Sequence, residues 1–282
     1  MFTGNPIADV PSYITPLAMQ IYVIVMLILV VGGTILDTLH KKSAKYFFEN
    51  AKKAEANRKR ELSGGEKTTI AIQTAAVDVL ASGEFCNPRR RVSHLLTMYG
   101  FILFLIGTVA LVFAYPTGTA PAFWPFIWHL GALMVMVGGY WFWFFIRVDV
   151  AAEGHKWYEV SLRADLFIVS LLATTTFAFV WSILESAGAG ALASLFFWLF
   201  VLSATILFGT VLWSKFAHMF FKPAAAYQKR IIQADGSREN LPADYDLTDP
   251  AVQEKFPDIP EYMGKNPSYM GLGIKRDAPQ HY

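Results

Sequence analysis

Long apolar runs alternate with polar segments along this chain, and five of the runs are longer than most core helices. A helix needs about 20 residues to cross the hydrocarbon core of a bilayer, because each residue adds about 1.5 Å along its axis. None of the five contains Asp, Glu, Lys or Arg, and none alternates as barrel strands do. The pattern therefore predicts an all-α integral membrane protein with five transmembrane helices. They are expected at residues 14–36, 95–115, 125–146, 166–184 and 190–213.

Composition and charge add an orientation to this prediction. Hydrophobic residues make up 54% of the chain and charged residues only 16%, which is not the balance of a soluble domain. All 24 lysines and arginines lie between the first and second runs, between the third and fourth, or after the fifth. Since basic loops are retained in the cytoplasm, we expect the N-terminus outside and the C-terminus inside.

This topology divides the chain into four segments. Residues 1–36 hold the N-terminal segment and the first span, and residues 37–93 form a cytoplasmic helical loop. Residues 94–222 form a membrane domain of four helices. Residues 223–282 are a polar C-terminal tail, whose prolines and aromatic residues favour an extended strap. Such a strap would wrap a partner protein or lie on the inner loops of this chain.

Two helical patterns lie in the inner loop, at residues 41–62 and 66–85. The second places Ile70 and Leu80 on one face, which could pack on the bundle or on a partner. The stretch between them, "LSGGEKTT" (62–69), resembles a fragment of a phosphate-binding loop. It lacks both the preceding strand and the Gly-Lys-Ser/Thr order that such a loop needs. We therefore expect a glycine turn between two helices.

Several kinds of chemistry find no support in the sequence. The single cysteine, Cys86, excludes an internal disulfide and any cluster held by four thiolates of this chain. No protease or hydrolase motif lies within or beside the spans. The paired broken segments of many transporters are also missing, although transport is not excluded on that ground.

Two histidines fall at the same predicted depth. His94 opens the second span and His218 follows the fifth, so antiparallel helices bring both to the inner face. Two neutral imidazoles on facing helices suit the axial positions of haem b iron. Arg90, Arg91 and Lys215 lie at this level and could meet the haem propionates. Alternatively, both histidines are interfacial polar residues, and the basic side chains follow the positive-inside rule alone.

His129 is the only ionisable side chain inside a predicted span. Intramembrane ionisable groups are candidates for function, so it could contact a quinone or a second cofactor. It could equally be a satisfied polar residue beside Trp128. At the inner end of the first span, Asp37 and His40 are one turn apart and form either a proton pair or an ordinary helix-end pair.

The segments "RRRVSHLLTMYGF" (89–101) and "SKFAHMFFKPAAAYQKR" (214–230) resemble the membrane cytochrome b subunits of heterodisulfide reductase and of quinone-interacting oxidoreductases. They are more distantly similar to the nitrate reductase gamma subunit. The resemblance covers the inner-loop helix from Ile70 and spans two to five. The chain lacks the cysteine-rich ferredoxin domain of some relatives, and it most resembles the membrane anchor that accompanies adenylylsulfate reductase.

The resemblance implies a function and a location. His94 and His218 match the family's haem ligands, and the subunit would carry electrons between quinone and a cytoplasmic flavin and iron-sulfur oxidoreductase. The partner would be adenylylsulfate reductase of dissimilatory sulfur metabolism, docked on the inner loops and the tail. The protein would then be a multi-pass subunit of the bacterial inner membrane. The alternative is a membrane docking anchor for a soluble enzyme, without redox chemistry of its own.

Overall fold

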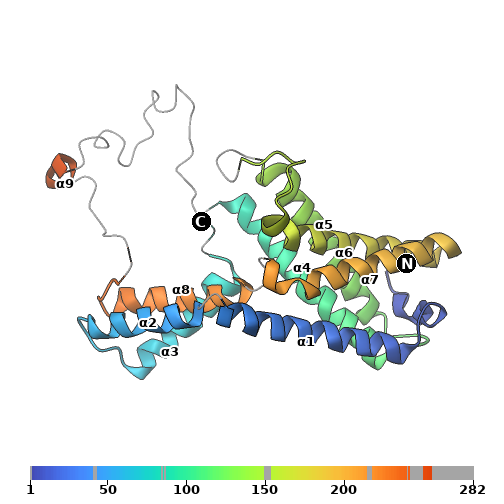
Figure 1. Ribbon diagram of the computed structural model, residues 1–282, viewed down its shortest axis with the longest axis horizontal. Coiled ribbons are helices and arrows are strands. Elements are labelled where there is room, and N and C mark those ends of the chain that lie inside the picture. Colours follow the sequence, from blue (N-terminus) through green and yellow to red (C-terminus); the bar gives the residue numbers. More distant parts are fainter. Residues whose placement is uncertain are drawn as a thin grey trace. The chain divides into compact units, whose positions relative to one another are not determined.

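The computed structural model describes residues 2–40, 43–83, 85, 87–148, 154–214, 218–239, 241 and 250–255. The chain divides into two compact units, each of which is described by itself. We call Met1–Phe47 with Pro88–Ala224 the membrane unit, and Phe48–Asn87 with Ala225–Tyr282 the polar unit. Figure 1 labels the helices of both.

Five helices of the membrane unit are long and apolar enough to cross a bilayer, which confirms the predicted fold class. No strand occurs among the described residues. The last part of the third span is a π-helical turn, η3, and the fifth span is followed by a 3₁₀ turn, η4 (Val211–Trp213). The spans are α1 (Pro16–His40), α4 (Pro88–Ala114), α5 (Phe123–Trp141) with η3 (Phe142–Ile146), α6 (Leu162–Ser186) and α7 (Gly190–Gly209).

Helices that follow each other in sequence form the main pairs of the bundle. The most extensive contacts are between α4 and α5 and between α6 and α7, while α5 joins the two pairs by packing on α6. The first span, α1, contacts α7, η4 and α4. Most of its surface is exposed, as expected for a helix that faces lipid on several sides.

Four glycines let α4 and α5 touch through their backbones. Gly100 on α4 meets Gly131 on α5, while Gly107 lies against Trp128 of α5 and Gly138 against Ser93 of α4. In each helix the two glycines are seven residues apart and so share a face. A methyl group on Gly131 would lie only 2.6 Å from the carbonyl oxygen of Gly100. Small residues allow this close approach. In lipid such packing is important, because the hydrophobic effect does not hold helices together there. We call the four residues the glycine seam.

An aromatic core fills the bundle at the end where the N-terminus lies. Trp128, Trp181 and Phe197 are fully buried there, and the 3₁₀ turn η1 (Pro6–Ser12) adds the buried side chains of Ile7 and Val10. The amide of Asn5 fixes this turn by donating to the carbonyl oxygens of Tyr115 and Gly118, 3.0 Å away in each case.

The polar unit contains α3 (Gly64–Gln73), the π turn η2 (Thr74–Leu80) and α9 (Pro250–Lys255). It also contains the larger parts of α2 (Ser43–Ala56) and α8 (His218–Ala234), both of which begin in the membrane unit. A bidentate ion pair between Asp78 and Arg230, with distances of 2.6 and 2.9 Å, ties η2 to α8. On the expected apolar face of the second inner helix, Leu80 is exposed and Ile70 is half-buried, so its contact with a partner stays a prediction.

The "LSGGEKTT" stretch is the start of a helix rather than a free turn. Ser63 caps α3, and Glu66 accepts from the Ser63 backbone amide at 2.8 Å while the Ser63 hydroxyl accepts from the Glu66 amide. The Ser63 amide and Arg60 lower the pKa of Glu66 to about 2. The helix N-terminus is thus already neutralised by a carboxylate of the chain itself.

Helix α8 also departs from expectation, because Pro223 lies inside it. Extended chain was expected from Pro223 onward, but residues 223–234 are helical. Proline removes one backbone hydrogen bond, and the following "AAAYQKRIIQA" is rich in helix-forming residues that continue the helix. Residues 242–249 and 256–282 of the expected strap lie outside the described residues.

The glycine seam generates a direct test. Gly131→Ala should lower the free energy of unfolding by about 1–3 kcal/mol, since its methyl group would meet backbone that cannot rotate away. Gly32→Ala is the matched control on α1, because Gly32 has open space around it and alanine favours a helix. Titrating detergent-solubilised protein with a denaturing detergent measures both. Equal stability of the two variants would contradict the seam.

Candidate functional site

Two elements contribute to one apolar cluster of the membrane unit: the face of α4 that carries His94, and the first turn of α8. His94 is half-buried and shares its helix face with Phe101, seven residues further on. Phe101 and Val211 are buried members of this cluster, against which Met219 and Phe221 of α8 also pack. The two histidine-bearing helices are therefore brought to a common place within the membrane unit.

His218 itself is described only through its backbone, as the first residue of α8. Lys215 lies outside the described residues.

Three arginines occupy the first turn of α4, directly after Pro88 at its first position. Arg90 and Arg91 are half-buried. Cations at a helix N-terminus are unfavourable, because the helix dipole adds partial positive charge there. An anionic group at this end relieves that repulsion, and both haem propionates and lipid phosphates have the required charge.

Among the described residues, His94 offers one imidazole and the cluster around Phe101 offers apolar surface, which are two of the features that a haem site needs. The glycine seam closes the space between α4 and α5, so a macrocycle cannot lie there. His94 is about 120–140° around α4 from the glycines of the seam, on the side that Phe101 and Leu105 make apolar. Within the described ranges no three His, Cys, Asp or Glu side chains are grouped as a metal site.

His129 is fully buried on α5, and both of its ring nitrogens have partners within the chain. Nδ1 lies 2.7 Å from the carbonyl oxygen of Pro125, which can only accept, so Nδ1 carries the proton. Nε2 then accepts from the hydroxyl of Ser182 on α6, also at 2.7 Å. The rings of Phe2 and Phe179 flank the imidazole. A quinone or a metal at His129 would have to displace Ser182.

Asp37 and His40 do not share one environment. Asp37 is buried at 4% exposure, whereas His40 is exposed at the end of α1. At the N-terminal end of the bundle, the hydroxyl of Tyr13 donates to Glu185 at 2.5 Å. Burial and this carboxylate raise the pKa of Tyr13.

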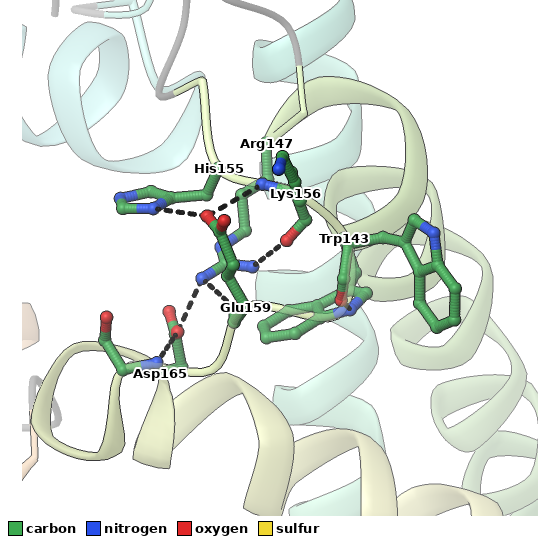
Figure 2. A network of polar contacts seen from close by, with 8 residues as sticks. Trp143, Arg147, His155, Lys156, Glu159 and Asp165 are labelled. Carbon is green, nitrogen blue, oxygen red and sulfur yellow. Dashed lines mark hydrogen bonds and ion pairs between the residues drawn. The ribbon is translucent and has the colours of Figure 1, made fainter.

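A buried ion pair, which the sequence did not predict, lies between the end of η3 and the first turn of α6. The guanidinium of Arg147 donates to the carboxylate of Asp165 at 2.6 Å, with side-chain exposures of only 1% and 9%. Asp165 also accepts from the backbone amide of Ser161, and Arg147 lies 4.1 Å from the ring centroid of Trp143. Figure 2 shows the pair with the loop that it supports. Its only signal in the sequence is a pair of opposite charges that flank a short loop between two spans.

The π turn η3 sets the direction of Arg147. The Arg147 backbone amide bonds to the carbonyl of Phe142, five residues back, at 2.8 Å. This wider turn carries one more residue than an α turn, so Trp143 and Arg147 continue the buried face of α5. A regular helix would rotate Arg147 away from that face.

Comparisons of the chain with models of protein families, with curated proteins and with solved structures found no match. The resemblance to membrane cytochrome b subunits therefore stays a prediction that depends on the motifs quoted above.

The Arg147 and Asp165 pair can be tested by removing one charge or both. Arg147→Met should cost about 3–5 kcal/mol of unfolding free energy, because it leaves a buried carboxylate unpaired. Arg147→Met combined with Asp165→Asn should recover part of that loss, as judged by denaturing-detergent titration.

Arg58→Met provides the control for that experiment. Arg58 makes exposed ion pairs with Glu55 and Glu61, at 3.7 and 3.6 Å. Its loss should change the unfolding free energy by less than about 1 kcal/mol. An equally small change for Arg147→Met would show that the buried pair does not support the fold.

Proposed function

We propose that this protein is the membrane anchor and electron-transfer subunit of an oxidoreductase complex. It would link a cytoplasmic flavin and iron-sulfur enzyme to the quinone pool through one haem b held by His94 and His218. The observation that carries the proposal is the common apolar cluster of the His94 face of α4 and the first turn of α8. The resemblance of the two histidine segments to membrane cytochrome b subunits supports it.

The residues of this chain would hold the group and set its surroundings. Haem would supply one-electron transfer between partner and quinone. His94 and His218 would act as neutral axial ligands, and Arg90, Arg91 and Lys215 would pair with the propionates. Phe101 and its neighbours in the cluster would exclude water from that side. The glycine seam would hold α4 rigidly while the oxidation state changes.

The partner is proposed from the resemblance and from the charge pattern. Adenylylsulfate reductase of sulfur metabolism is the expected enzyme, docked on the polar unit and the C-terminal tail of a multi-pass protein of the bacterial inner membrane. Helix α2 supports a docking role, since most of its side chains are exposed and several are charged. Quinone would bind between helices of the membrane unit. His129 is a weak candidate for that contact, because its nitrogens are already bonded.

A second candidate is a docking anchor without redox chemistry. The saturated hydrogen bonding of His129 favours it, because the histidine inside the third span then has a structural role. In this case the histidines at the inner face would bond to headgroups or carbonyls.

Separate replacement of the two histidines distinguishes these functions. Protein purified from haem-replete cells should show the absorption of a b-type haem with two imidazole ligands. His94→Ala and His218→Ala should each lower bound haem about tenfold or more, because iron loses an axial ligand. His155→Ala is the matched control, since that side chain is half-exposed in a loop and should leave the spectrum unchanged.

A colourless native preparation would overturn the haem assignment. Retention of partner binding and of quinone-linked activity by both alanine variants would favour the docking anchor instead.

A further inference from the structure

Side chains from the end of the third span hold the loop before α6 in place by donating hydrogen bonds to its backbone carbonyls. Arg147 donates to the carbonyl oxygen of Glu159 at 2.9 Å and lies 3.5 Å from that of Lys156. The indole nitrogen of Trp143 donates to the carbonyl of Trp157 at 2.9 Å. Figure 2 shows these groups converging on the segment from the end of α5. Three inward-facing carbonyls fix the backbone, so the side chains must project outward.

Those outward side chains are large and apolar. Trp157, Tyr158 and Val160 have exposed fractions of 58%, 59% and 60%. Their surface continues onto the last turn of the third span, because the ring of Phe144 lies 6.2 Å from that of Trp157 and Phe145 is 71% exposed. We call these five residues the aromatic patch. A contiguous apolar surface of this kind marks a site of contact with a partner or a membrane.

We propose that the aromatic patch anchors the protein in the phospholipid headgroup region of the bilayer. Continuity with the third span identifies the occupant, since Phe144 and Phe145 belong to a helix whose outer surface faces acyl chains. The hydrocarbon core must end near Ile146, where that span ends, and Trp157 and Tyr158 follow directly. Trp and Tyr rings prefer this depth, because each has an apolar body and one polar group.

Charge in the loop points to the interface itself rather than to anionic lipid. Lys156 and Glu159 have opposite charges, and the Lys156 ammonium lies 5.7 Å from the Tyr158 ring centroid. Glu159 accepts from the Lys156 amide at 3.2 Å and lies 3.8 Å from His155. With little net charge, the anchor should be insensitive to salt and to the anionic lipid content. The buried Arg147 and Asp165 pair then acquires a role, which is to hold the patch at one height.

Quenching of Trp157 fluorescence tests this proposal in the full chain. The protein is reconstituted in zwitterionic vesicles whose lipids carry bromine either close to the glycerol or near the end of the acyl chain. The signal of Trp157 is the difference between native protein and Trp157→Phe. Shallow bromine should quench it about twofold more strongly than deep bromine, and aqueous iodide should quench it little.

Trp198 is the matched control, because it is 47% exposed and lies near the middle of α7. Its signal, obtained with Trp198→Phe, should be quenched more by deep bromine. Strong iodide quenching of Trp157 would place the patch in water. Protection from both iodide and bromine would place it against protein, such as a partner or a second copy. Either result would overturn the proposal.

The support beneath the patch can be tested without removing the buried charges. Trp143→Phe deletes the hydrogen bond to the Trp157 carbonyl and keeps an aromatic ring. In this variant the signal of Trp157 is the difference between Trp143→Phe and the double variant that also carries Trp157→Phe. Iodide should quench that signal about twofold more than in native protein, because the loop becomes less fixed. An unchanged value would contradict the supporting role of Trp143.

Discussion

The packing of the membrane unit depends on how closely α4 and α5 approach each other. Glycines seven residues apart on each helix allow this approach, and at Gly100 and Gly131 the two backbones meet directly. Nothing else fits between these helices. Groups that need space must lie on the other faces of α4, and His94 lies on one of them. The same seam thus limits where a cofactor can bind and holds fixed the helix that would carry its ligand.

Three polar contacts inside this bundle each join two elements. His129 connects α5 to α6 through Ser182, Arg147 connects η3 to α6 through Asp165, and Tyr13 connects the N-terminal turn to Glu185. In a medium of low dielectric constant an unpaired group is costly, so these contacts fix the relative register of the helices. The pairing at His129 also shows why an ionisable residue in a span need not be a binding site.

The spans were predictable because bilayer thickness and backbone hydrogen bonding leave few alternatives for a long apolar run. Close packing at Gly138 follows a similar constraint, since small residues inside a span allow helices to approach closely. The Arg147 contact was not predictable, because it depends on a π turn that adds one residue to the helix face. Neither was α8, where a favourable run of alanines continues the helix past Pro223. Both cases depend on local backbone geometry, which periodicity alone does not encode.

The positive-inside rule alone does not explain why Arg90 and Arg91 lie in the first turn of α4. That rule requires basic residues on one side of the membrane but does not require them in the first turn of a helix. There, Arg90 and Arg91 repel both each other and the helix dipole, and they are half-buried, so water screens them incompletely. Sequences that only needed topology could place the same charges in the preceding loop at lower cost. An anionic group near the end of α4 would make their position more favourable. Lipid phosphates carry the charge this requires, and so do the haem propionates of the proposed function.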